Sequence, residues 1–231
     1  MRVLFLAFAL PFCTPAQAQT PPSSDQIAHY DGLHEAAHQD DAKAIRALVA
    51  RGADPDARDS AGRTPAHVAA FASSDRALRA LAGAGADMNA LESHAYDVLT
   101  IAAVANDPAL VALALDLGNR PDLVTSPYQG TALIAAAHLG HAGIVSRLAA
   151  AGAPLDHVNN LGWTAVMEAV VLGDGGQGHI ETVRALTKAG ADVSLADREG
   201  VTPLEHAEAR GYRAIADILR EGRKSGSQEE N

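Results

Sequence analysis

Histidine is the residue type that could most readily bind a metal ion here, since the chain has ten histidines in 231 residues. His138 and His141 lie three positions apart. A zinc or copper site needs three or four ligands of this kind, and the sequence offers no third ligand at a usable spacing. A carrier of a metal ion or small ligand, which would use the histidines and the glycine-rich segment 173–179, therefore stays only an alternative function.

Residues 173–178, Gly-Asp-Gly-Gly-Gln-Gly, match the dinucleotide-binding pattern G-x-G-x-x-G. That pattern binds a pyrophosphate where it follows a strand and opens a long helix within a βαβ unit. Here it follows a predicted helix, and Asp174 would repel a phosphate. Two interpretations stay open for this segment: a tolerated flexible loop, or a mobile loop that contacts a partner.

Catalytic motifs are not evident. The chain has no His-Glu-x-x-His and no Gly-x-Ser-x-Gly, and its single cysteine is Cys13. The scattered aspartates and glutamates fall at predicted turns, where capping and solvation explain them. We expect no enzymatic activity, no catalytic residue and no cofactor.

A repeat of about 33 residues sets the positions of the histidines and acidic residues along the chain. Six equivalent positions are occupied, in chain order, by Asp31, Thr64, Asp97, Thr131, Thr164 and Thr202. Successive positions are separated by 33, 33, 34, 33 and 38 residues. Thr or Asp at this position can cap a helix, and Pro65 and Pro203 suit its first turn. An apolar stripe at helical spacing follows in each unit, and a glycine then ends the second helix: Gly52, Gly85, Gly118, Gly152 and Gly190.

The Thr-Pro-Ala-His tetrapeptide at 64–67 and the Gly-Ala-Asp at 85–87, repeated at this period, resemble the ankyrin repeat. The resemblance implies an all-α solenoid of about six helix-turn-helix repeats with short β-hairpin fingers. It also implies that His34 and His67 hydrogen-bond between neighbouring repeats, and that His141 and His179 occupy the family's Gly-His position. No single unit can bury its apolar face alone, so the units must stack.

The resemblance covers residues 27–222, with repeats at about 27–58, 59–91, 92–124, 125–158, 159–197 and 198–222. The third repeat departs most, since Asp97 to Thr100 replace the tetrapeptide, and this puts its hairpin geometry in doubt. The fifth repeat has an insertion of five residues within 172–179, between its two helices. Residues 19–26 and 223–231 are polar, and we expect a disordered leader and a disordered tail.

Residues 1–18 resemble a cleavable secretory signal: Arg2, an apolar run, and Ala16-Gln17-Ala18 before the expected cleavage. The run is too short to span a membrane, and Phe12 fits poorly with lipidation of Cys13. We therefore expect a periplasmic or secreted bacterial protein.

Charge limits the partners. Without residues 1–18, 17 basic and 28 acidic residues give a net charge of −11, which argues against nucleic acid and against an anionic membrane surface. No membrane span is expected, and the free protein is expected to be a monomer.

In the resembled family, the fingers and first helices line a concave face that binds other proteins. Aromatic and arginine side chains dominate binding energy at such interfaces. The resemblance therefore implies a non-enzymatic scaffold that binds a partner protein, such as an exported enzyme or toxin that it supports, protects or inhibits. The partner-binding residues that it implies are Arg63, Tyr96, Tyr128, Asn160, Trp163 and Arg198.

Overall fold

The computed structural model of the protein describes residues 19–229, with side chains as far as Arg223. The expected signal segment 1–18 and Cys13 lie outside the described residues, as do the last two residues of the expected tail. In the described part, no helix is long and apolar enough to cross a membrane.

Six inner helices of seven residues each form the centre of the molecule. Capping side chains start four of them: Asp97, Thr131, Thr164 and Thr202 each accept a hydrogen bond from the backbone amide three residues ahead. The caps confirm the predicted starts, including the doubtful third repeat, where the Asp97 carboxylate replaces a threonine hydroxyl. The inner helices are α2 (Gly32–His38), α4 (Pro65–Phe71), α6 (Val98–Val104), α8 (Ala132–His138), α10 (Ala165–Val171) and α12 (Pro203–Ala209).

Each inner helix is followed by an antiparallel outer helix. Five of these end before the predicted glycines, whose φ angles lie between 86° and 95°, as the left-handed end of a helix requires. The outer helices are α3 (Ala42–Ala50), α5 (Asp75–Gly83), α7 (Pro108–Asp116), α9 (Ala142–Ala150), α11 (Gln177–Ala189) and α13 (Arg213–Glu229).

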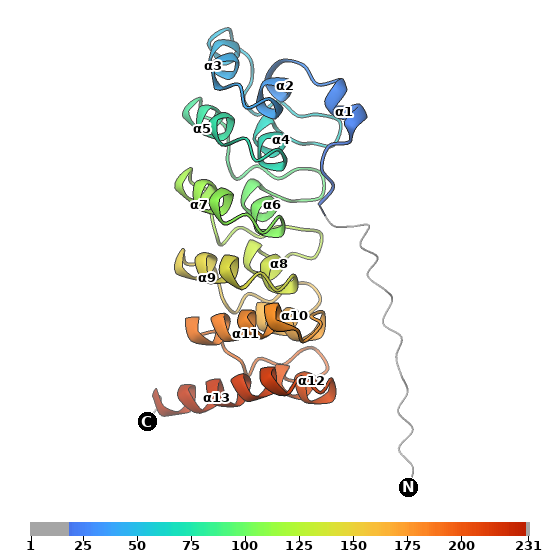
Figure 1. Ribbon diagram of the computed structural model, residues 1–231, viewed down its shortest axis with the longest axis vertical. Coiled ribbons are helices and arrows are strands. Elements are labelled where there is room, and N and C mark those ends of the chain that lie inside the picture. The colour runs from blue at the N-terminus through green and yellow to red at the C-terminus, as the bar shows by residue number, and fades with distance from the viewer. Residues whose placement is uncertain (1–18, 230–231) are drawn as a thin grey trace.

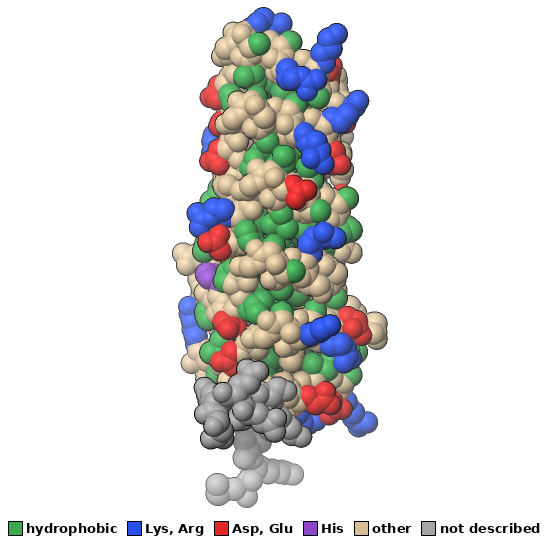
Figure 2. Space-filling view, turned by 90° about the vertical axis from the view of Figure 1, so that its left-hand side faces the viewer, with side chains coloured by type: hydrophobic (Ala, Val, Ile, Leu, Met, Phe, Trp, Pro, Cys, Tyr) green, Lys and Arg blue, Asp and Glu red, His purple; other side chains and the backbone are tan. Residues whose placement is uncertain are grey.

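The helix pairs stack into one elongated solenoid, with the outer helices along one side, the fingers along the other and the inner helices between them (Figure 1). Alanine pairs on the inner helices are buried and allow neighbouring units to approach closely, as at Ala69, Ala102 and Ala136, each 0% exposed. The predicted all-α solenoid is confirmed. Seen from the outer-helix side, charged side chains of both signs are spread from one end of the molecule to the other (Figure 2).

The fingers are hairpins too short for regular strands; among the described residues, only Thr125 and Gly130 form a β-bridge. Backbone bonds close each one, from Asp59 N to Arg63 O (3.0 Å) and likewise in the later units. Adjacent fingers are also joined, since the Ser93 amide donates to Ala61 O and the Asn160 amide to Tyr128 O. The third finger is regular, because the Glu92 side chain accepts from the amides of His94 and Tyr96.

The structure differs from the expectation at both ends of the domain. The expected disordered leader contributes to a helix, α1 (Ser24–Ala28), because Ser23 and Gln26 form a reciprocal capping box. The expected disordered tail begins inside α13, which continues past Gly222 to Glu229. Polar composition alone did not reveal either helix.

Candidate protein interface

Four histidines join neighbouring units rather than forming a metal site. The Nε2 atoms of His34 and His67 lie 3.0 Å from the carbonyl oxygens of Arg63 and Tyr96. His141 Nδ1 lies 3.0 Å from Ala103 O, and His179 Nε2 lies 2.9 Å from His138 O. These contacts confirm the inter-repeat role implied for His34 and His67. In the part of the chain that the structure describes, no three histidine, cysteine or acidic side chains cluster to hold a metal ion.

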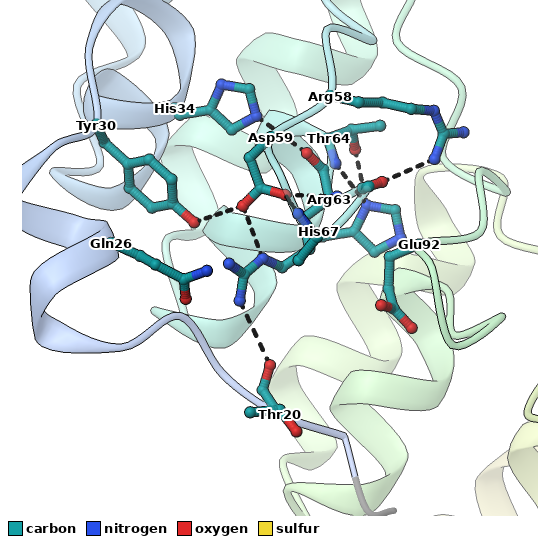
Figure 3. Close-up of polar contacts among 12 residues, drawn as sticks. Thr20, Gln26, Tyr30, His34, Arg58, Asp59, Arg63, Thr64, His67 and Glu92 are labelled. Atoms are coloured by element: carbon teal, nitrogen blue, oxygen red, sulfur yellow. Dashed lines mark hydrogen bonds and ion pairs between the residues drawn. The ribbon is translucent and has the colours of Figure 1, made fainter.

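Arg63 is buried, although we expected it on the binding surface. Its residue exposure is 2%, its Nε atom donates to Asp59 at 2.8 Å, and its Nη1 atom reaches Thr20 O at 3.4 Å (Figure 3). The hydroxyl of Tyr30 donates to the same carboxylate at 2.8 Å. The segment from Thr20 to Tyr30 thus covers the second finger, and Arg63 is a structural residue.

Asp59 is the centre of this buried cluster. Burial alone would raise the pKa of Asp59, but hydrogen bonds from the Arg63 amide, the Tyr30 hydroxyl and the Arg63 guanidinium hold it below its usual range. Burial raises the pKa of Tyr30, and its hydrogen bond to Asp59 adds to the effect. The cluster therefore holds α1 against the first two repeats with a charged carboxylate and a neutral phenol.

Tyr96 is also removed from the expected surface, being only 8% exposed. Tyr128 and Trp163 are half-buried, and Asn160 and Arg198 are exposed. The last two join fingers: Asn160 Nδ2 donates to Pro127 O at 3.1 Å, and Arg198 Nη2 donates to Asn160 O at 2.6 Å. The fourth to sixth fingers therefore form a connected row, with four of the six predicted partner-binding residues on it.

The exposed large hydrophobic side chains concentrate in the fourth and fifth units and their edges. At 36–52% exposure, those among the described residues are Val124, Leu139, Val158, Leu161 and Leu172. Val124 and Val158 directly precede fingers, Leu161 lies within one, and Leu139 and Leu172 follow the inner helices α8 and α10. We call these five residues the apolar surface. Soluble proteins seldom gather exposed apolar side chains in this way except at binding sites.

A buried carboxylate joins the two ends of the apolar surface. Glu168 on α10 is 4% exposed; its Oε1 atom accepts from Asn159 Nδ2 at 2.8 Å, and its Oε2 atom lies 3.0 Å from His138 Nδ1. Asn159 adjoins Val158 on the finger side, while His138 adjoins Leu139 at the helix ends. The surface is therefore held in one fixed arrangement.

Sequence reasoning missed all five of these residues in its list of partner-binding positions, although four of them could have been found. The signal was present at equivalent repeat positions: Val124 and Val158 stand where the second unit has Arg58, and Leu139 and Leu172 stand where it has Ala72. Comparing units at the positions just before the finger and just after the inner helix would have found them.

The insertion of the fifth unit is held by contacts within itself and with the neighbouring units, which its glycine-rich sequence did not predict. Asp174 Oδ1 accepts from the Gly176 amide and lies 2.8 Å from His179 Nδ1. Tyr212 donates from its hydroxyl to Gly173 O at 3.1 Å, and its ring leaves no room for a side chain at Gly175, whose φ is 70°. Part of the insertion extends α11 to 13 residues, against nine in α9. It follows a helix rather than a strand, as expected.

A family model for "Ankyrin repeats (3 copies)" matches residues 18–92 and 99–197. The "Putative ankyrin repeat protein YahD" of Escherichia coli (strain K12) is 38% identical over 112 residues, 48% of this chain and 56% of that protein. The chain thus spans little more than half the length of that curated relative.

Solved structures are similar over most of the chain. An ankyrin repeat domain (ABAYE2397) from Acinetobacter baumannii AYE has a TM-score of 0.76 and 41% identity, over 82% of this chain and 96% of that one. The ankyrin repeat protein EF0377 has a TM-score of 0.75 and 33% identity, over 83% and 98%. A chain in the complex of the predatory endopeptidase Bd0816 of Bdellovibrio bacteriovorus with the immunity protein Bd3460 has a TM-score of 0.68, over 83% and 98%. At 22% identity that likeness shows the fold alone.

Proposed function

This chain belongs to the ankyrin repeat family of protein–protein interaction scaffolds, and from that premise we propose that it is exported and binds one partner protein through the apolar surface. The observation that carries the proposal is the gathering of Val124, Leu139, Val158, Leu161 and Leu172 on adjacent units. Half-buried Tyr128 and Trp163 on the same row of fingers add aromatic area of the kind that dominates interface energies.

Rigidity is the physical basis of binding in this proposal. The fingers are joined by backbone bonds, and Glu168 connects the finger side to the helix ends. A surface that is already ordered loses little conformational entropy on binding, so more of the contact energy appears as affinity. The scaffold needs no catalytic group, and the proposal includes none.

The partner class in this proposal is an exported enzyme or toxin that the scaffold supports, protects or inhibits. Residues 1–18 support export through their signal-like pattern, with cleavage after Ala18 and a periplasmic or secreted mature protein that is monomeric when free. The Bdellovibrio complex of an endopeptidase with an immunity protein, which includes a chain of this fold, is a precedent for such a pairing.

The test is a crosslinked pull-down from the envelope fraction of the producing cell, with tagged wild type beside Leu161→Ala/Leu172→Ala. We expect one protein to be recovered by wild type and lost from the variant, while circular dichroism shows unchanged helix content. Arg46→Ala/Arg79→Ala, two exposed positions on the outer helices, is the matched control and should recover the same protein. Equal recovery by all three proteins would reject the apolar surface as the binding site.

Export is tested separately, by the intact mass of the mature protein and by the cell fraction in which it is found. The intact mass of the mature protein should correspond to a chain that begins at Gln19. A chain that keeps residues 1–18 and stays with the cytoplasmic fraction would reject export and leave the binding surface to be judged by the pull-down.

A further inference from the structure

The insertion of the fifth unit lies beside the helix-end part of the apolar surface. Leu172 precedes the insertion directly, and Leu139 precedes Gly140, whose carbonyl oxygen lies 2.9 Å from where a Cβ on Gly178 would stand. His179 reaches back to His138 O at 2.9 Å. The insertion is therefore packed against the turn that carries Leu139.

Contacts on three sides hold the insertion in place. His179 and Gly178 fix it to the fourth unit, Tyr212 of the sixth unit fixes it through Gly173 O and Gly175, and Asp174 closes its own turn. A segment held by both neighbouring units presents its exposed groups in fixed positions, as a specificity-determining element must.

Asp174 is the charged group that the insertion presents. Its side chain is 79% exposed, and the contacts to Gly176 and His179 both use the Oδ1 atom. The backbone hydrogen bond from Gly176 and the contact with His179 hold the pKa of Asp174 below its usual range, so the carboxylate is charged at neutral pH. Among the side chains that the structure describes, no lysine or arginine pairs with it.

Two arginines border the apolar surface, and both are already hydrogen-bonded: half-buried Arg210 donates to Val171 O and His206 O, and Arg198 on the sixth finger donates to Asn160 O. The five apolar residues carry no charge, and the fourth and fifth fingers present Pro127, Tyr128, Gln129, Asn160, Leu161 and Trp163. The one acidic group within this surface, Glu168, is buried and already partnered. An exposed carboxylate at the border of an apolar surface is complementary to an apolar segment flanked by a cation.

We propose that the insertion selects the partner: Leu139, Leu172 and the Asp174 carboxylate together recognise a protein segment in which apolar side chains are followed by a lysine or arginine. This inference rests on the proposed function and specifies the partner's chemistry. The apolar side chains supply the contact area, and Asp174 disfavours segments that carry an acid at the same place.

The experiment pans a random 12-residue phage-displayed peptide library on the immobilised mature chain and measures the selected peptides, made synthetically, against three variants. Asp174→Asn keeps the oxygen that Gly176 and His179 contact and removes only the charge. Asp192→Asn is its matched control, because Asp192 is an exposed aspartate whose Oδ1 atom likewise accepts from the amide two residues ahead, at 2.8 Å. Leu139→Ala/Leu172→Ala tests the apolar contacts.

We expect selected peptides to combine apolar residues with lysine or arginine, to bind Asp174→Asn about fivefold more weakly, and to bind Asp192→Asn like wild type. Peptides that lose affinity for the leucine variant but not for Asp174→Asn would overturn this inference and leave the proposed function standing. Peptides that bind the leucine variant like wild type, or a library that yields no binder, would overturn both.

Discussion

At the scale of single residues, His67 shows how the repeat sequence sets stability. It is 1% exposed, its Nδ1 atom accepts from the Thr64 amide at 3.1 Å, and its Nε2 atom donates to Tyr96 O at 3.0 Å. Both bonds are made by one neutral tautomer of the imidazole. The ring therefore joins a helix start in the second unit to the finger of the third.

His67→Ala should lower the free energy of unfolding by about 1–3 kcal/mol, because the Thr64 amide and the Tyr96 carbonyl would be left unpaired in a buried place. Urea denaturation followed by circular dichroism measures this. His94→Ala, at a fingertip histidine whose side chain is 60% exposed, is the control and should change little. An unchanged midpoint for His67→Ala would contradict the structural role.

The pH dependence of stability distinguishes this role from simple loss of packing. Burial lowers the pKa of His67, although its hydrogen bond to Tyr96 opposes the shift. The unfolded chain takes up this proton first, so the stability that the neutral ring contributes is present above about pH 6.5 and is lost as the pH falls below it. Between pH 7 and pH 5, wild type should therefore lose more stability than His67→Ala.

At the scale of elements, the insertion of the fifth unit and the N-terminal helix α1 follow one rule. Each lies outside the repeat pattern, and each is fixed by side chains from a neighbouring unit: Tyr212 holds the insertion, and Asp59 holds Tyr30 after α1. Segments of this kind become ordered because long-range contacts outweigh the entropy of a short polar stretch.

Tyr212→Ala should loosen the insertion while the repeats stay folded, because the mutation removes both the hydrogen bond to Gly173 O and the ring packed on Gly175. Hydrogen exchange measured by mass spectrometry should become faster in peptides covering 173–179 and stay unchanged in α4 and α6. Unchanged exchange in 173–179 would show that Asp174 and His179 suffice to hold the segment.

At the scale of the whole molecule, the stacked units form one continuous apolar core from Leu33 to Leu219. The inner helices and fingers thus behave as a single rigid support, on which the exposed apolar residues of the fourth and fifth units are the distinctive surface. A net charge of −10 for the full chain keeps such a surface soluble without steering it toward nucleic acid.

The scaffold function predicts that metal removal has no effect on the whole molecule. A ligand that binds the native state stabilises it by mass action, so a metal carrier should melt at a lower temperature in excess EDTA. We expect the melting temperature to be the same with and without EDTA after purification without chelators. A fall of several degrees would favour the carrier alternative.

The sequence by itself determined the repeat: its period, the capping residues that start the inner helices and the glycines that end the outer helices, while the bonds of His34 and His67 between units followed from the family resemblance. These features are local or recur at a fixed offset, so residue type and spacing suffice to predict them. Asp97 replaces threonine at one cap position, and the helix start there could still be predicted because a carboxylate accepts the same backbone hydrogen bond as a hydroxyl.

Only the tertiary structure decided which finger side chains face solvent. Arg63 and Trp163 occupy the same position of their repeats, yet Arg63 is buried because Thr20 and Tyr30, 43 and 33 residues earlier, fold over it. The order of the insertion likewise depends on Tyr212, 39 residues from Gly173. Thr20 precedes the repeats and the insertion interrupts one of them, so the repeat pattern does not predict these contacts, and exposure depends on what the rest of the chain places beside a residue.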